Sequence, residues 1–316
     1  MGASWNEIEF GIGIPQVLNQ PRAETGRLRL FLARAEELGF ASAWVLEQPI
    51  GTAGVLEPLS LLAHAAAVTT RIRLGTAVIL VPLRTPVGLA KELATIDQLS
   101  GGRLIAGLAL GGEQEHYPAF GLSPDGRARR FEEALRLLKL LWTEPSVTYE
   151  GEFWRLHGVA VEPKPIQRPH PAVWLGGGHP SAIRRAARMA DGWIGAGSTS
   201  TVQFAEAVGI LSRALVAEGR GPATTRVAKR VYVALDADTE RARSRLRRWC
   251  SVFYGDPDVA DRVGVFGPTD VCITGLAEVA RAGAHLIIVN PVFDEEEQAE
   301  RFASEVIPRV QAEMAK

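Results

Sequence analysis

The sequence predicts an α/β protein built as a single (β/α)8 barrel with inserted loops and one small hairpin. Two observations favour this fold. Short apolar segments of strand length alternate with longer segments of helical periodicity, and eight strands each precede a helix. The strand segments are apolar on both faces, as is typical of parallel strands covered by helices. An open, doubly wound sheet with an appended domain is the alternative, since 316 residues suffice for either.

The first half of the chain contains four of the strand–helix units. The expected strands are residues 9–14, 41–46, 72–81 and 104–110. The helices that follow them are residues 28–38, 58–68, 87–99 and 125–142. Gly39 ends the first helix, and Pro58 suits the first turn of the second. The fourth helix is amphipathic, with its apolar residues along one stripe.

An insertion around residues 145–170 separates the two halves. Alternating residues and glycines in 149–161 predict a small hairpin, and the proline-rich residues 163–171 are not helical. The later strands are residues 172–175, 193–196, 227–235 and 285–289. The later helices are residues 180–190, 202–218, 238–253, 269–282 and 295–313. Residues 256–265 are polar and match no element. We therefore expect one domain over residues 1–316.

Composition and charge argue against several functional classes. The net charge of −1 provides no field that would attract nucleic acid or an anionic membrane. Five arginines between Arg241 and Arg248 predict a solvated helix face rather than a phosphate-binding patch. No signal segment and no apolar stretch of ~20 residues is present. Cys250 and Cys272 lack metal-ligand spacing, and no set of histidines and carboxylates has it. We expect a soluble, cytoplasmic protein without a metal.

Three glycines lie where a phosphate-binding turn is expected. Gly176, Gly177 and Gly178 follow the fifth strand directly and precede a helix. Backbone N–H groups at the start of a helix, unshielded by side chains, suit a phosphate. Ser181 would add a hydroxyl donor. A tight turn that needs glycine only for its backbone angles is the alternative.

Two candidates for acid–base chemistry lie in loops after barrel strands, where catalytic groups accumulate. Glu47 follows the second strand and either hydrogen-bonds a ligand or serves as a structural carboxylate. His116 follows the fourth strand, and an imidazole titrates near neutrality; an ordinary surface histidine is the alternative. Gln48 can hydrogen-bond but cannot shuttle a proton at neutral pH.

Several segments, taken in chain order, form a recognisable set. They are residues 43–47, 75–82, 97–103, 107–113, 120–121, 163–167, 174–178 and 190–193. The set resembles the bacterial luciferase-like monooxygenase family. The resemblance implies a TIM barrel that binds reduced FMN or the deazaflavin coenzyme F420. It also implies that the enzyme either inserts oxygen from O₂ or transfers a hydride.

The resemblance further implies cofactor contacts at particular positions. A non-proline cis peptide at Ala77–Val78 would bend the third strand and support the ring. Leu110 and Gly111 would lie beside the cofactor, although some FMN-using members carry arginine at the position of Leu110. Phosphate binding would then depend on backbone donors or on nearby arginines. The arginines considered are Arg127, Arg129 and Arg184.

The sequence departs from the family pattern after Glu47. Family members commonly carry a histidine there, whereas this chain has Gln48. The departure motivates one alternative from another class, a non-catalytic barrel subunit that supports a homologous active chain. A barrel hydrolase with two carboxylates, such as Glu47 and Glu113, is a further alternative.

The resemblance favours a flavin-dependent monooxygenase that uses reduced FMN and O₂ on a small organic substrate. A coenzyme F420-dependent dehydrogenase or reductase is the alternative within the family. A separate flavin reductase and a second copy of the chain are the expected partners, with no role for nucleic acid or membrane. Three loops are expected to shape the substrate pocket. They are residues 50–57, 149–157 and 253–265.

Overall fold

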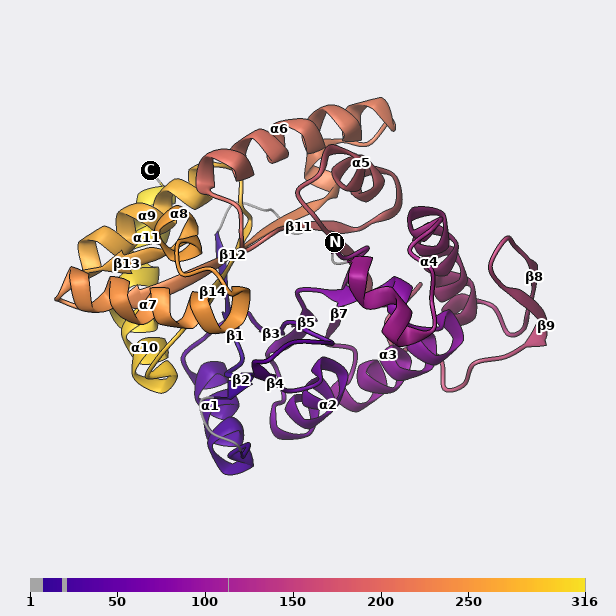
Figure 1. Ribbon diagram of the computed structural model, residues 1–316, viewed down its shortest axis with the longest axis horizontal. Helices are drawn as coiled ribbons and strands as arrows, with labels where there is room; N and C mark the ends of the chain where they lie inside the picture. Colours follow the sequence, from indigo (N-terminus) through magenta and orange to yellow (C-terminus); the bar gives the residue numbers. More distant parts are fainter. Residues whose placement is uncertain (1–7, 19–21, 113, 316) are drawn as a thin grey trace.

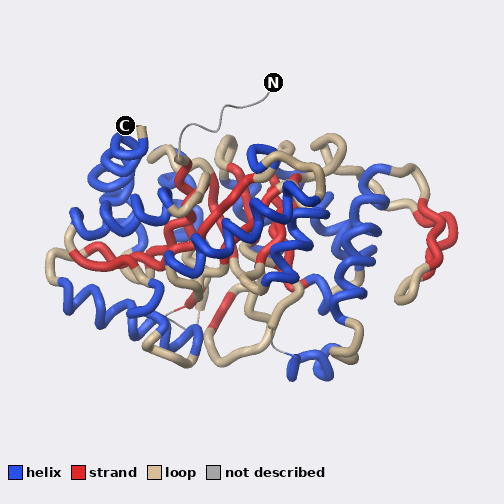
Figure 2. Tube along the Cα trace, turned by 90° about the horizontal axis from the view of Figure 1, so that it is seen from above, coloured by secondary structure: helices blue, strands red, loops and turns tan. Residues whose placement is uncertain are grey.

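The computed structural model describes residues 8–18, 22–112 and 114–315. Within them, eight strands form the barrel: β1 (Glu9–Gly13), β3 (Ser42–Val45), β5 (Arg73–Thr76), β7 (Leu104–Ala109), β10 (Ala172–Gly176), β11 (Gly192–Gly195), β12 (Arg226–Leu235) and β14 (Leu286–Pro291). All neighbours pair in parallel, and the β7–β10 and β1–β14 pairings close the ring. The predicted (β/α)8 barrel is confirmed (Figures 1 and 2).

Helices surround the strands and bury the main core against them (Figure 2). The helices are α1 (Thr25–Glu37), α2 (Pro58–Val68), α3 (Pro86–Ser100), α4 (Arg127–Thr143), α5 (Pro180–Met189), α6 (Thr201–Ala217), α7 (Thr239–Tyr254), α8 (Val259–Val263), α9 (Thr269–Arg281), α10 (Glu295–Arg301) and α11 (Ile307–Met314). Hydroxyl caps start two of them, because Thr85 and Ser200 accept from backbone N–H groups of α3 and α6. No helix in the described part of the chain is long and apolar enough to cross a membrane.

Two tryptophans fill the interior of the barrel. Trp44 on β3 and Trp174 on β10 are almost fully buried, and their ring centroids lie 5.6 Å apart. Glycines on adjacent strands make room for them. A Cβ at Gly75 would lie 2.4 Å from the Trp44 ring, and one at Gly192 would lie 2.7 Å from the Trp174 ring. The barrel is therefore a packed core rather than a pore.

The family-like segments 97–103 and 163–167 meet outside the barrel wall. Asp97 is fully buried, and its carboxylate accepts from the N–H groups of Ile166 (2.7 Å) and Gln167 (3.0 Å). The Gln167 amide also donates to Asp97 (2.7 Å) and to the carbonyl of Leu104 on β7 (2.8 Å). These segments hold the inserted chain to β7 and contribute no residue to the main cavity.

The third expected strand is interrupted where the resemblance implied a bend. Residues 72–81 form β5 and the short β6 (Ile79–Leu80), and the Ala77–Val78 peptide between them is cis. A 3-10 turn, η1 (Val81–Leu83), follows. Gly107 on β7 allows this path, since a Cβ there would lie 1.7 Å from the carbonyl oxygen of Thr76.

Smaller elements complete the fold. The predicted hairpin is present as β8 (Val147–Glu150) and β9 (Arg155–Val159), and it projects beyond α4 at the edge of the molecule (Figure 1). The ribbon of β2 (Val17–Leu18) and β4 (Gly54–Val55) was not predicted from the sequence. Residues 256–265, for which no element was predicted, contain α8 and the start of β13 (Val265–Gly267), which pairs with β12.

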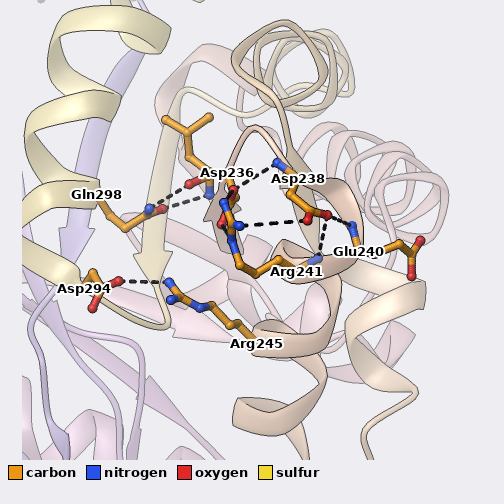
Figure 3. Close-up of polar contacts among 8 residues, drawn as sticks. Asp236, Asp238, Glu240, Arg241, Arg245, Asp294 and Gln298 are labelled. Carbon is orange, nitrogen blue, oxygen red and sulfur yellow. Dashed lines mark hydrogen bonds and ion pairs between the residues drawn. The ribbon is translucent and has the colours of Figure 1, made fainter.

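The arginine-rich face of α7 is paired with carboxylates, as the interpretation of a solvated helix face expected. The pairs are Arg241 with Asp236, Arg243 with Asp261, Arg245 with Asp294, and Arg247 with Asp258 and Asp261. Figure 3 shows the part of this network that joins α7 to the end of β12. Beside it, the backbone of Leu235 and the side-chain amide of Gln298 exchange two 2.8 Å hydrogen bonds.

Candidate active site

A cavity of about 790 Å³ opens at the carboxyl ends of the barrel strands. Nine of the ten site residues predicted from the sequence line it. They are Glu47, Ala77, Val78, Leu110, Gly111, Gly176, Gly177, Gly178 and Ser181. The chain therefore gathers residues from the ends of four strands, β3, β5, β7 and β10, in one place, although their roles remain predictions.

The glycine turn between β10 and α5 forms one wall of the cavity. Gly177 has a φ of 134°, a conformation that favours glycine, and its carbonyl accepts from the Trp193 indole at 3.0 Å. His179 caps α5, since its Nδ1 accepts from the Ser181 N–H at 3.3 Å. The Ser181 hydroxyl lies 2.8 Å from the same nitrogen. This hydroxyl, predicted as a phosphate donor, thus already has a protein partner.

Two arginines line the same side of the cavity. Arg127, at the start of α4, donates to the carbonyl of Gly111 at 3.2 Å. Arg185, on α5, is buried and paired with Glu132 at 2.8 Å. Arg129 instead pairs with Glu152 on the surface, and the exposed Arg184 does not line the cavity. The α4–α5 side is therefore where an anionic group of a ligand would meet cations and backbone N–H groups.

Val78 and Gly176 are in close contact across the cavity wall. A Cβ at Gly176 would lie 2.8 Å from Cγ1 of Val78, so only glycine leaves the valine in place. Ala77, Val78, Leu110 and other small or apolar residues also line the cavity. Such a lining suits a flat, largely apolar ring.

Glu47 is almost fully buried, and both its carboxylate oxygens are engaged. Oε2 accepts from the N–H of Leu80 and Oε1 from the Arg84 guanidinium, both at 2.5 Å. Arg84 also pairs with Glu57 at 3.0 Å. These contacts favour the structural alternative for Glu47, which positions the chain after β6 at the edge of the cavity.

His116 does not line the cavity, contrary to what its predicted catalytic role requires. It lies in the 3-10 helix η2 (Gln114–Phe120), where the buried neighbour Tyr117 turns inward toward the carbonyl of Leu110 at 3.4 Å. No sequence pattern indicates which of these two adjacent residues faces inward. Glu113, in the same loop, lies outside the described residues.

The substrate loops are placed differently from what the sequence led us to expect. Phe253 and Tyr254, from the third loop, line the main cavity. Residues 55–57, from the first loop, line a neighbouring cavity of about 340 Å³ that shares Glu47. The hairpin loop contributes to neither, and its His157 lies 3.8 Å from Glu150 in solvent.

Sequence reasoning missed a set of cavity-lining residues on and after β12. Arg230 and Tyr232 point from β12 into the barrel, and the hydroxyls of Tyr232 and Tyr254 lie 2.5 Å apart. Tyr232 also packs on Trp249, with ring centroids 4.9 Å apart. Burial raises the pKa values of both phenols above the ordinary range. The signal in the sequence was the pair Lys229 and Arg230 inside an otherwise apolar strand, because charged side chains are rarely buried unless they are paired.

Lys229 precedes Arg230 on β12, so its side chain points to the other face of the strand, away from the barrel interior. Its ammonium group donates to the carbonyls of Ala196 (2.5 Å) and Thr199 (2.8 Å) and to the Thr199 hydroxyl (3.0 Å). Burial lowers its pKa to about 7. It anchors the loop after β11, whose residues 196–198 line the cavity.

The described residues contain no cluster of side chains that could hold a metal ion. In residues 8–18, 22–112 and 114–315, no three histidine, cysteine, aspartate or glutamate side chains gather closely enough to hold a metal ion. Both cysteines are buried, and burial raises the pKa of each thiol to about 12.

The comparison with known proteins identifies the family. A family model described as luciferase-like monooxygenase matches residues 8–286. The chain belongs to the luciferase-like monooxygenase family. It is therefore an oxidoreductase, since relatives in this family depend on FMNH₂ or F420.

Curated relatives of this luciferase-like chain include users of both cofactors. The F420-dependent glucose-6-phosphate dehydrogenase of Kineococcus radiotolerans is 30% identical over 90% of this chain and 92% of that protein. The FMNH₂-dependent dimethylsulfone monooxygenase of Pseudomonas putida is 37% identical over 41% of this chain and 37% of that protein. These relatives limit the expected cofactor to reduced FMN or F420, and they include users of each.

Solved structures of luciferase-like proteins match nearly the whole chain. Monooxygenase RslO1 from Streptomyces bottropensis has a TM-score of 0.82 and 27% identity, covering 95% of this chain and 99% of that one. An F420-dependent secondary alcohol dehydrogenase has a TM-score of 0.85 over 96% of this chain and 99% of that one. Its 18% identity supports the shared barrel fold alone.

Proposed function

We propose that this luciferase-like enzyme is a monooxygenase that uses reduced FMN and O₂ to oxidise a small organic substrate. The observation that carries the proposal is the division of the cavity lining. The α4–α5 side offers Arg127, Arg185 and the backbone of the glycine turn, which suit a phosphate. The centre offers small and apolar residues, which suit a flavin ring.

The residues present fit the cofactor. The volume of about 790 Å³ lies in the range of roughly 300–1,000 Å³ that is typical of ligand sites. Gly177, Gly178 and Arg127 would hold the phosphate, and Ala77, Val78 and Leu110 would hold the ring. Reduced FMN, when bound, supplies the electrons that activate O₂. The chain itself orients the ring, excludes water and positions the substrate.

The engagement of the one carboxylate and the one imidazole among the described lining residues supports oxygenation over dehydrogenation. A dehydrogenase that removes a hydride from an alcohol must also accept a proton. Among the described lining residues, His179 is the only imidazole, and its Nδ1 caps α5. Glu47 has both oxygens engaged by Leu80 and Arg84. Neither group is placed as a free base in the centre of the cavity.

A coenzyme F420-dependent dehydrogenase or reductase is the second candidate. The nearly full-length similarity to the Kineococcus radiotolerans enzyme favours it. The same glycine turn and cations would hold the phosphate of either cofactor, so the two candidates differ in chemistry rather than in the anchor. A deazaflavin does not activate O₂ readily, so consumption of O₂ distinguishes the two candidates.

The proposal also includes partners. A separate flavin reductase would supply reduced FMN, and two copies of the chain would form a dimer through helices beside β3 and β5. Sedimentation of the purified protein at micromolar concentration should give twice the monomer mass of 34.1 kDa. A monomeric mass would remove the dimer from the proposal and leave the chemistry untouched.

Cofactor choice is tested by parallel titrations of the purified protein with FMN and F420, each oxidised and reduced, under anaerobic conditions. Oxygen is then admitted to the reduced FMN complex, and O₂ consumption and product formation are followed with a panel of small organic substrates. We expect binding of reduced FMN and transfer of one oxygen atom to a substrate. Tight F420 binding with no measurable affinity for FMN would contradict the proposal and favour the second candidate.

A further inference from the structure

Arg230 is a buried cation on the wall of the main cavity. It lies in the middle of β12, is 5% exposed, and lines the cavity together with Ala77 and Tyr232. Burying a guanidinium group is costly unless hydrogen bonds and an opposite charge compensate it. The surroundings of Arg230 should therefore show what this cation is for.

The partners of Arg230 in the protein are neutral. Its Nε and Nη2 donate to the side-chain oxygen of Asn290, the former at 3.2 Å, and its Nη1 donates to the carbonyl of Ala77 at 3.2 Å. The guanidinium carbon lies 5.7 Å from the centroid of the Tyr232 ring. A guanidinium has five N–H donors, so these three bonds leave two donors for a ligand.

No carboxylate of the described residues forms an ion pair with Arg230. Glu47 is the one described carboxylate in the cavity lining, and its own partner is Arg84 at 2.5 Å. Arg185, by contrast, has a carboxylate partner, Glu132, at 2.8 Å. Within residues 8–18, 22–112 and 114–315, the positive charge of Arg230 therefore has no carboxylate partner, and Arg230 lines the cavity.

The position of Arg230 is fixed rather than adaptable. Asn290 on β14 is 7% exposed and holds the guanidinium through its side-chain oxygen. Gly13 on β1 makes room for this asparagine, because a Cβ there would lie 2.5 Å from the asparagine oxygen. The third bond of Arg230 reaches the carbonyl of the cis peptide that the ring is proposed to contact. A cation held in this way is preorganised for charge that develops beside it.

We propose that Arg230 is the counter-ion for the negative charge of the reduced cofactor and makes the cavity bind the reduced form more tightly than the oxidised form. The inference depends on the proposed function, because it requires a flavin-type ring in this cavity. Reduction by two electrons leaves such a ring able to carry a negative charge, and protein charge near the ring tunes its electronics. Arg230 would thus raise the reduction potential of the bound cofactor.

The first test uses the wild-type protein. Dissociation constants are measured anaerobically for the oxidised and reduced forms of FMN and, in parallel, of F420. We expect the reduced form of the cofactor that binds to be held at least ~10-fold more tightly, which is ~30 mV for a two-electron couple. Equal affinities, or tighter binding of the oxidised form, would overturn the inference while leaving the proposed function intact. Failure of both cofactors to bind would overturn both.

Variants then assign the effect to the residue. Arg230→Met and Arg230→Gln remove the charge, and each should lower the ratio of reduced to oxidised affinity ~10-fold. Arg230→Lys keeps a charge and should retain most of the ratio. Arg127→Met is the matched control: it removes a cation from the α4–α5 side and should weaken both forms equally. Circular dichroism confirms that each variant is folded.

The outcomes distinguish an electrostatic role from a structural one. Loss of affinity for both forms to the same extent in Arg230→Gln would mean that the arginine only shapes the cavity, and would overturn the inference. An unchanged ratio in a folded Arg230→Met protein would do the same. If neither neutral variant folds, the wild-type ratio and its retention in Arg230→Lys remain decisive.

Discussion

At the scale of single residues, the cavity depends on close contacts that only one side chain allows. Gly176 and Val78 are the clearest case, since an added Cβ would lie 2.8 Å from Cγ1 of Val78. A β-branched side chain has few rotamers with which to relieve the contact. The valine would then move into the cavity or the strand end would shift.

Gly176→Ala should therefore lower the free energy of unfolding by about 1–3 kcal/mol and weaken FMN binding ~10-fold, which is about 1.4 kcal/mol. Urea denaturation and FMN titration measure the two effects. Gly178→Ala is the control for stability, because its Cβ would meet Thr199 at an ordinary 3.6 Å. Equal stabilities of the two variants would show that the contact of Val78 with Gly176 does not matter.

At the scale of elements, buried polar side chains hold segments in place around the barrel. Asp97 on α3 holds the inserted chain through Ile166 and Gln167, and Lys229 on β12 anchors the loop after β11. Neither side chain touches the centre of the cavity. Both act by fixing the backbone that carries the cavity wall or encloses the barrel, so their substitution should affect stability first.

Asp97→Asn should cost about 2–4 kcal/mol of stability. The carboxylate accepts three hydrogen bonds from Ile166 and Gln167, and an amide would direct its NH₂ group at one of these donors. Gln98→Ala removes one exposed hydrogen bond to Lys164 and should cost less than about 1 kcal/mol. Thermal and urea unfolding of both variants provide the comparison. A cost for Asp97→Asn no greater than that of Gln98→Ala would contradict the assignment.

Lys229 makes stability depend on pH. Its folded pKa of about 7 lies below the value of about 10.4 in an unfolded chain, so between these values the unfolded state binds more protons. The contribution of Lys229 to stability should then rise with pH by up to about 1.4 kcal/mol per unit from pH 7 to 10. The difference in unfolding free energy between wild type and Lys229→Met isolates it. A difference that stays constant or falls over this range would mean that the pKa of Lys229 is not lowered in the folded protein.

At the scale of the whole molecule, sequence reasoning succeeded where local patterns determine structure. The alternation of apolar strands with amphipathic helices along the chain was sufficient to predict the barrel. Residues just after expected strands, such as Glu47 and the glycine turn at Gly176, line one cavity, since parallel strands end at one face.

The residues that escaped prediction depend on tertiary packing. Tyr254 reaches the cavity from the end of α7, and its pairing with Tyr232 joins positions 22 residues apart. His116 was predicted because an imidazole is the usual acid–base group, yet the turn of η2 directs the neighbouring Tyr117 inward. Arg230 was missed because the charge of a strand residue says nothing about which face it occupies.

The central claim is that the cavity holds a ring cofactor by its phosphate at the glycine turn. Comparison of FMN with riboflavin tests it most directly, because the two molecules share the ring and differ in the phosphate. Isothermal titration under identical anaerobic conditions should show FMN, in its reduced form, binding at least ~100-fold more tightly than reduced riboflavin, about 2.8 kcal/mol. Equal affinities, or binding of neither, would contradict the account.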